Sequence, residues 1–372
     1  FNGAPRTGIY VLSLRDALPI WTMKCSLVLV AVALCAAVAS AAVLQEALQA
    51  PKPWYLAKKS KTVNMAEKLD MTIAFQRKNT AEMERIFWEV SDPKSHKYGE
   101  HLSHEQMRAL VSPGASAISA VKAWLKLHGI AESEVSRHED SLKFTATVAQ
   151  VSALLKVKFI VYENKQTGKQ MSRALGAIII PNELTSVIQL VAGHRGFPFP
   201  TRPRPVSKKA VPKADVKAQG PWNMNVTPSL LWDVYKEHEH PPVPAGHHNI
   251  QSFFQAQGQY VRQADLTQFC EGLMGEGFTG NCQINKYVGT NSGNDPGVES
   301  SLDSQYITAT GYGLDTWAYS YSGNDFCADL LSWAQDVFGE KDGTFPYVIS
   351  MSYGSQALPT YCTNEGLHRL AE

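Results

Sequence analysis

This sequence of 372 residues has no excess charge of one sign, no long apolar run and few cysteines. Lys plus Arg number 35 and Asp plus Glu 34, giving a formal net charge of +1. A nucleic-acid partner is therefore not expected, because phosphate binding favours a basic surface. Hydrophobic residues are 44% and charged residues 19% of the chain, a globular balance that argues against disorder and against a coiled coil. The length allows two or three domains.

The most apolar segment has the proportions of a signal peptide. It follows Met23 and Lys24, contains roughly a dozen apolar residues and ends at Ala39-Ser40-Ala41, a small-residue cleavage pattern. A transmembrane anchor is the less favoured alternative, because a span needs ~20 apolar residues. We expect residues 23–41 to be a signal peptide, so that the mature protein has no membrane span. Residues 1–22 contain no methionine and are expected to be extraneous upstream sequence.

Removal of this segment leaves four cysteines, Cys270, Cys282, Cys327 and Cys362. An even number in a secreted protein favours disulfides, and none of the four has zinc-ligand spacing. Cys270 and Cys282 bracket a Gly-rich loop and are expected to pair, although four cysteines allow three connectivities. Asn225 lies in an Asn-Val-Thr sequon and is the predicted glycosylation site.

Residues 42–200 alternate between helical and strand patterns. Apolar residues at i, i+3, i+4 and i+7 predict a helix with one buried face over residues 81–92. A capping box over residues 103–106 predicts a second helix, and an apolar stripe over residues 118–125 predicts a third. Further on, we expect strands over residues 142–148 and 157–162 and a short helix between them. The combination predicts a small α+β sandwich.

Residues 201–221 contain six basic residues, one acidic residue and four prolines, which indicates an exposed linker. It is either a solvated spacer or a processing site. A second domain is expected from residue 222, with a helix starting at Thr227-Pro228. Helices over residues 294–312 and 325–338 and strands over residues 316–321 and 346–354 predict a parallel α/β sheet. Because two or three such strands cannot cover both faces, we expect this sequence to be part of a longer polypeptide.

Glu299 and Asp303 are the candidate catalytic residues. On a predicted helix they are four residues apart and share one face. Repulsion between two such carboxyl groups raises one pKa, and a hydrogen bond between them lets one stay ionised as a base. Spacing alone is weak evidence. The sequence has four further acidic pairs at this spacing, which are expected to be solvated helix faces: Asp233/Glu237, Asp295/Glu299, Asp325/Asp329 and Asp336/Glu340.

The residues around this pair, Gly-Val-Glu-Ser-Ser-Leu-Asp-Ser-Gln-Tyr at 297–306, resemble the Glu and Asp motif of the sedolisin family of serine-carboxyl peptidases. Residues 98–103, 226–229 and 352–354 resemble other motifs of that family in the same order. The resemblance implies a zymogen. Residues 42–200 would be an inhibitory prodomain of ferredoxin-like α+β fold, residues 201–221 a linker with the maturation site, and residues 222–372 the first part of a truncated, subtilisin-like α/β parallel-sheet domain.

In that family a serine attacks the scissile carbonyl, a Glu is the general base, an Asp supports it and a second Asp completes the oxyanion hole. The resemblance assigns Glu299 as the base and Asp303 as its support. It places the nucleophilic serine, the oxyanion Asp and the calcium ligands beyond residue 372, so this fragment is expected to be inactive. The implied activity is release of tripeptides from the free N terminus of polypeptides, in a lysosome or after secretion.

An acidic working pH follows from the chemistry of the pair, since an imidazole base is protonated at pH ~4 to 5 while a carboxylate is still partly ionised. Three alternatives stay open. His238, His240, His247 and His248 could bind a transition metal, although a surface loop is favoured because no rigid element fixes their geometry. A subtilisin with a Ser-His-Asp triad is the second alternative and is also an enzyme. A secreted propeptide-like inhibitor of other peptidases is the non-enzyme alternative.

Overall fold

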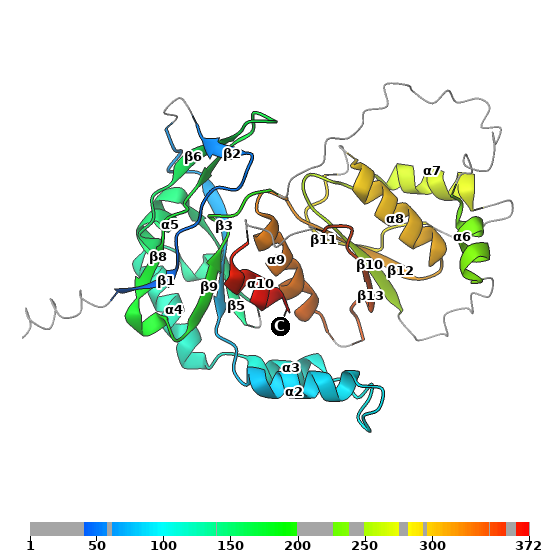
Figure 1. Cartoon of the computed structure of the whole chain (residues 1–372), viewed down its shortest axis with the longest axis horizontal. Coiled ribbons are helices and arrows are strands. Elements are labelled where there is room, and N and C mark those ends of the chain that lie inside the picture. Colours follow the sequence, from blue (N-terminus) through cyan, green and yellow to red (C-terminus); the bar gives the residue numbers. More distant parts are fainter. Residues whose placement is uncertain are drawn as a thin grey trace, which may run out of the picture.

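The computed structural model describes residues 41–57, 62–138, 140–198, 226–237, 249–274, 282–292, 296–341, 343–354 and 362–371. The predictions for residues 1–22, for the signal peptide up to Ser40, for the linker 201–221, for Asn225 and for the four clustered histidines lie outside these residues. The described chain forms a mixed α/β structure with two units (Figure 1). We call residues 41–198 the first unit and residues 226–371 the second unit. None of the helices in the described ranges has the length and apolar content needed to cross a bilayer.

The centre of the first unit is a four-stranded antiparallel sheet. Its strand order is β4 (Val135–His138), β5 (Ser141–Thr147), β3 (Lys68–Phe75) and β9 (Ile188–Ala192). Alternation along β3 and β5 sends one set of apolar side chains to α4 (Ala115–Leu127) and α5 (Val148–Leu155), where they form the main core. The other face of the sheet is therefore free to contact the second unit.

Most predicted elements of the first unit are confirmed. All four apolar residues of the stripe predicted for α4 are buried, and the helix ends before Gly129, whose φ is +74°. The predicted strand over residues 157–162 starts later, since β6 covers Ile160–Asn164. Strand β6 lies between β2 (Trp54–Leu56) and β7 (Gln170–Arg173), and β1 (Ala41–Gln45) pairs with β8 (Ile178–Pro181). Two short 3-10 helices cover Glu132–Glu134 and Asn182–Leu184.

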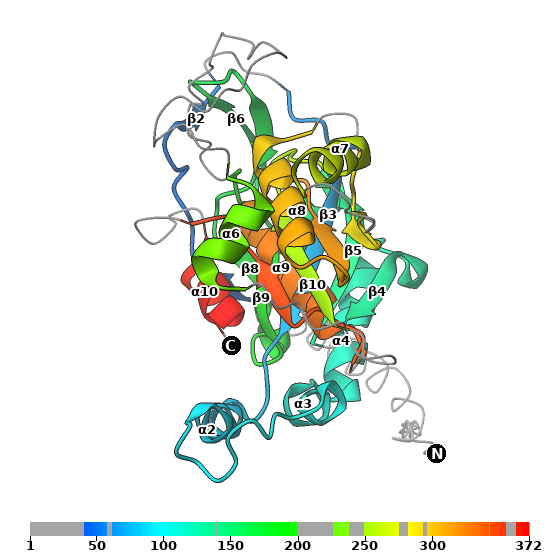
Figure 2. The ribbon, with the colours of Figure 1, turned by 90° about the vertical axis from the view of Figure 1, so that its right-hand side faces the viewer.

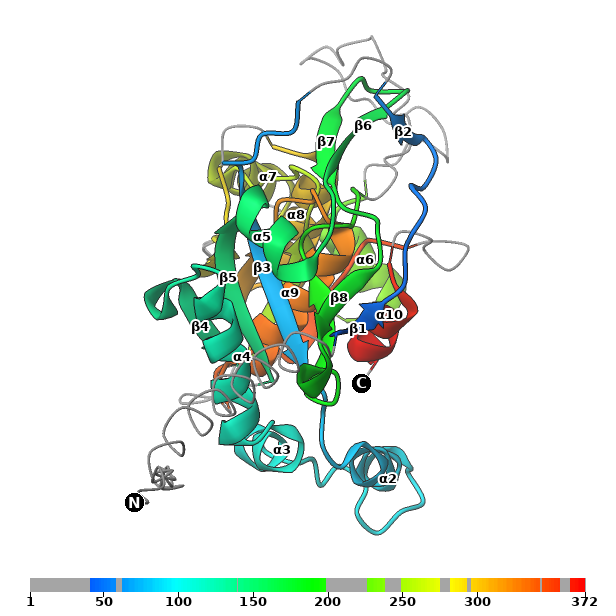
Figure 3. The same ribbon diagram turned by 90° about the vertical axis from the view of Figure 1, so that its left-hand side faces the viewer.

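The helices α2 (Thr80–Ser91) and α3 (His104–Val111) lie away from both sheets (Figure 3). The predicted capping box is present at α3, where Ser103 Oγ accepts from the Gln106 amide at 3.1 Å. The prediction of a buried face on α2 is wrong. Val90 is its one buried residue, and Phe87 is 55% exposed. A periodic stripe shows that a helix is amphipathic, but α2 packs against α3 and has no sheet beside it.

The second unit contains a parallel sheet, as the sequence predicts, but with four strands in place of the expected two or three. Its order is β11 (Lys286–Gly289), β12 (Asp315–Ser320), β10 (Ile250–Gln255) and β13 (Val348–Ser350). The apolar core on one face joins the sheet to α7 (Gln263–Leu273) and α8 (Val298–Thr310), while α9 (Phe326–Phe338) covers the other (Figure 2). Helix α6 (Pro228–Tyr235) begins where predicted, since Thr227 Oγ accepts from the Leu230 amide at 3.2 Å.

Two disulfides link elements of the second unit. Cys270 bonds to Cys282, which confirms the expected pair, and Cys327 of α9 bonds to Cys362. The second bond ties α9 to the segment that leads into α10 (Asn364–Ala371). Helices α9 and α10 lie between the two sheets, against the face of the first unit that α4 and α5 leave free (Figure 1).

Charged contacts join the two units. Lys143 of β5 pairs with Asp336 of α9 at 2.9 Å. Arg369 of α10 pairs with Asp140 at 2.6 Å, and both side chains are only 3% exposed. An antiparallel unit is thus docked on a parallel α/β unit, and the predicted domain boundaries stay predictions. The ferredoxin-like and subtilisin-like assignments stay predictions.

Candidate active site

Glu299 and Asp303 lie one turn apart at the start of α8, on the helix that the sequence predicts for them. The loop between β10 and α7 holds this terminus in place. Gln259 Oε1 accepts from the Glu299 amide at 3.2 Å, and Ser300 Oγ donates to the Tyr260 carbonyl at 2.7 Å. A Cβ on Gly297 would lie 1.7 Å from Gln259 Oε1. Glycine is therefore required at the residue that precedes the helix.

The two carboxyl groups occupy different environments. Glu299 is half-buried in the first turn, whereas Asp303 is only 7% exposed. The pKa of Asp303 is raised to about 6, because burial and the charge of Glu299 together outweigh the hydrogen bond from Ser352, which lowers it. The structure thus places a buried acid with a raised pKa one helical turn from the more accessible side chain of Glu299.

The expected hydrogen bond between these two carboxyl groups is not present. Asp303 Oδ1 accepts instead from Ser352 Oγ at 2.7 Å, across from the end of β13. Asp303 Oδ2 is buried and has no hydrogen-bond partner. No sequence signal points to this contact, because Ser352 is 49 residues from Asp303 and lies in a strand motif with no obvious partner.

A hollow of about 340 Å³ opens beside Asp303, between α6, α8 and β13. Apolar side chains from α6 and α8 form part of its wall, and Asp303 and Ser350 contribute polar atoms. Water can therefore approach Asp303, the buried member of the pair, through this hollow. The arrangement can accept, hold and return a proton, which is the task of an acid–base pair.

The acidic pair Asp325/Asp329 on α9 is not a solvated helix face, so that prediction is wrong. Asp325 is 8% exposed, caps α9 by accepting from the Ala328 amide at 3.1 Å, and also accepts from the Gly196 amide of the first unit at 3.0 Å. Burial and the charge of Asp325 raise the pKa of Asp329 to about 7. Both residues belong to the contact between the units, which sequence spacing cannot reveal.

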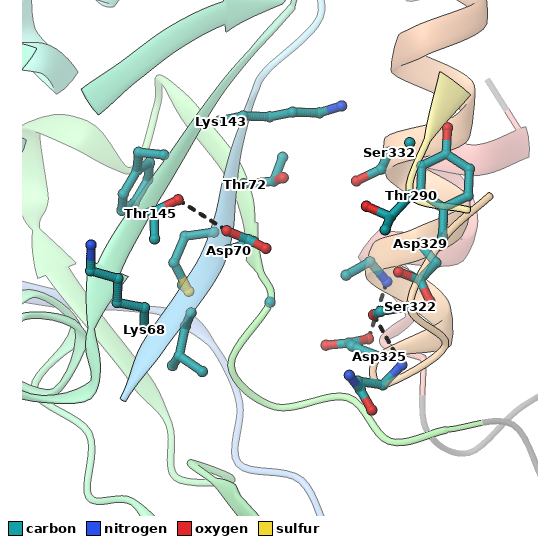
Figure 4. Close-up of a pocket in the computed structure, with 18 of the residues that line it drawn as sticks. Lys68, Asp70, Thr72, Lys143, Thr145, Thr290, Ser322, Asp325, Asp329 and Ser332 are labelled. Carbon is teal, nitrogen blue, oxygen red and sulfur yellow. Dashed lines mark hydrogen bonds between the residues drawn. The ribbon is translucent and has the colours of Figure 1, made fainter. Parts of the chain in front are cut away.

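A polar cavity of about 770 Å³ lies at this contact (Figure 4). One wall is the free face of β3 and β5, with Asp70 and Lys143, and the other wall includes α9, with Asp325 and Asp329. The contact between the units therefore combines this polar cavity with a small apolar cluster, in which Ala74 and Leu190 of the first unit pack against Leu331 of α9.

Within the described ranges, no group of three or more His, Cys, Asp or Glu side chains could hold a metal ion. The calcium ligands implied by the resemblance are expected beyond residue 372, so calcium stays a prediction. The histidine cluster at 238–248 lies outside the described residues.

Comparison with known proteins finds one matching family and several similar peptidases. Residues 56–197 match the family described as Pro-kumamolisin, activation domain, and these residues make up most of the first unit. Tripeptidyl-peptidase 1 of Mus musculus is 28% identical over 294 residues, 78% of this chain and 51% of the relative. The Homo sapiens protein of that name is 28% identical over 290 residues, 77% of this chain and 50% of the relative.

These matches confirm the resemblance to the sedolisin family that the motifs predict. The match to the activation domain falls within the first unit. The chain spans about half the length of the curated relatives that it matches. The roles of Glu299 and Asp303 are untested by these matches and stay predictions.

Proposed function

We propose that this chain is the N-terminal part of an acid-acting serine-carboxyl peptidase precursor, which releases tripeptides from the free N terminus of polypeptides. The match to the Pro-kumamolisin activation domain and the name of the similar relatives support the peptidase class. The observation that carries the proposal is Asp303, a buried acid with a pKa of about 6 one helical turn from Glu299. A buried acid beside a partly accessible carboxylate is the arrangement that general base catalysis in acid requires.

In this proposal Glu299 takes the proton of the attacking serine hydroxyl, because it is the more accessible member of the pair. Asp303 is proposed to support Glu299 by offering it a hydrogen bond when protonated, a bond that the described structure does not contain. Asp303 is more than nine-tenths protonated at pH ~4.5 if its pKa is about 6. The nucleophilic serine and the oxyanion Asp are proposed to lie in sequence beyond residue 372, and residues 1–372 are proposed to be inactive without them.

The first unit is proposed to be the intramolecular inhibitor of the precursor. Its sheet packs on α9 and α10 of the second unit through the ion pair of Lys143 with Asp336 and through apolar side chains that include Leu190 and Leu331. The boundaries proposed from the sequence are 42–200 for the prodomain, 201–221 for the linker with the maturation site and 222–372 for the first part of the catalytic domain. A signal peptide at 23–41 and glycosylation at Asn225 would take the precursor to a lysosome or out of the cell.

The test uses the full-length precursor, matured with an added protease. A hexapeptide with a free N terminus and its N-acetylated form are incubated with the enzyme at pH 4.5 and pH 7.5, and products are identified by mass spectrometry. We expect a tripeptide from the free peptide at pH 4.5, and little cleavage of the acetylated peptide or at pH 7.5. Internal cleavage of both peptides would replace the exopeptidase by an endopeptidase. Absence of cleavage, with inhibition of other peptidases, would favour the non-enzyme alternative.

A further inference from the structure

We propose that Ser352 is a positioning residue of the acid pair, which holds the Asp303 carboxyl so that Oδ1 accepts a hydrogen bond and Oδ2 carries the proton. This inference rests on the proposed function of Glu299 and Asp303. It adds the group that orients the supporting acid and names the oxygen that is protonated.

The first step is the hydrogen-bonding pattern of the carboxyl group. Ser352 Oγ donates to Asp303 Oδ1 at 2.7 Å, and Asp303 Oδ2 is buried with no partner in the described structure. A hydroxyl that donates to one carboxyl oxygen stabilises that oxygen as an acceptor. A proton added to Asp303 therefore goes to Oδ2, the oxygen that is free to offer it to a neighbour.

The second step is that Ser352 is itself held in place. The adjacent Tyr353 hydroxyl accepts from the Ala256 amide at 2.9 Å and donates to the Ala256 carbonyl at 3.1 Å. The Tyr353 ring packs against Phe254, with ring centroids 5.4 Å apart. The end of β13 is thus fixed to the end of β10. Ser352 is exposed, so its hydroxyl is not part of the core.

The third step is the direction of the electrostatic effect. The Ser352 hydrogen bond lowers the pKa of Asp303, whereas burial and Glu299 raise it. Loss of the hydroxyl removes the one opposing influence, so the pKa of Asp303 should rise above about 6. A role limited to packing would leave this pKa unchanged, because alanine and serine differ by one exposed hydroxyl.

The first experiment measures the Asp303 pKa in the complete chain by carbon-13 NMR of labelled aspartate, with Asp303→Asn to assign the signal. Ser352→Ala should raise the pKa, and Ser352→Thr, which keeps the hydroxyl, should stay near the unsubstituted chain. Ser301→Ala is the matched control, because Ser301 lies on α8 two residues from Asp303 and so on another face. An unchanged pKa in Ser352→Ala, or equal shifts in Ser352→Ala and Ser301→Ala, would overturn the proposal.

The second experiment follows the matured full-length enzyme. If protonated Asp303 is the active form, Ser352→Ala should move the alkaline limb of the kcat profile to higher pH and Ser352→Thr should restore it. An alkaline limb that does not move, in an enzyme that Glu299→Gln inactivates, would refute the role of Ser352 alone. Full activity in Glu299→Gln would instead refute the proposed function of the pair.

Discussion

His194 is predicted to make the first unit lose stability in acid. It follows Gly193, whose φ is +105° and whose Cβ would lie 2.1 Å from the Asp70 carbonyl oxygen, so glycine is needed to turn the chain there. The His194 side chain is fully buried, and neither ring nitrogen has a hydrogen-bond partner. Burial, together with the charges of Arg195 and Arg173, lowers its pKa from 6.5 to about 3. The folded structure therefore holds the neutral imidazole.

The size of the effect follows from proton linkage. The unfolded imidazole gains a proton near pH 6.5, but the folded one resists protonation down to about pH 3. The stabilising contribution is fully present above pH 6.5 and is lost progressively as the pH falls towards 3. At pH 4.5 the loss amounts to about 3 kcal/mol, or about a hundredfold in the opening equilibrium. The segment that opens carries Gly196, whose amide bonds to Asp325 of α9.

Hydrogen exchange at Ala174 reports this opening, because its amide donates to the His194 carbonyl at 3.1 Å. Between pH 7.5 and 4.5 its protection, corrected for intrinsic exchange, should fall about a hundredfold in the unsubstituted chain. His194→Leu cannot gain a proton and should lose much less. His96→Leu, at an exposed histidine, is the matched control and should follow the unsubstituted chain. Equal loss of protection in His194→Leu would refute the reasoning.

Two further substitutions test the contact between the units. Arg369→Met removes one of the two cations that pair with buried Asp140. It should lower the free energy of unfolding, measured by urea denaturation at pH 7, by about 3 kcal/mol. A loss below ~1 kcal/mol would contradict a buried ion pair. Gly196→Ala places a Cβ 1.9 Å from the Asp325 carboxyl and so disturbs the contact between the units. The linker should then be cleaved faster by added protease at neutral pH. An unchanged rate would show that this contact does not hold the units together.

The elements predicted with most success are those whose signals are local. The stripe of α4, the capping box at Ser103 and the cap at Thr227 each depend on residues within one or two turns, and all are confirmed. The parallel sheet follows from short apolar runs alternating with helices. Such patterns depend only on the residues of the segment itself, which decide which side chains face the core and where the helix begins.

The errors arise where the neighbour of a segment decides the outcome. The stripe on α2 has the right period, but no sheet lies against it, so Phe87 stays exposed. Asp325 and Asp329 have the spacing of a solvated face, but the first unit covers them. Within the candidate site the helical placement of Glu299 and Asp303 was predictable. The partner of Asp303 was not, because Ser352 reaches it only through the strand order of the sheet.

The central claim is that a carboxylate at Glu299 deprotonates the attacking hydroxyl, and Glu299→Gln tests it most directly. The glutamine keeps the shape of the side chain but cannot accept the proton. In the matured full-length enzyme at pH 4.5, kcat for a short peptide should fall at least about a hundredfold, with Glu271→Gln, at an exposed position of α7, as active as the unsubstituted enzyme. Turnover by Glu299→Gln within a few-fold of the unsubstituted enzyme would contradict the account.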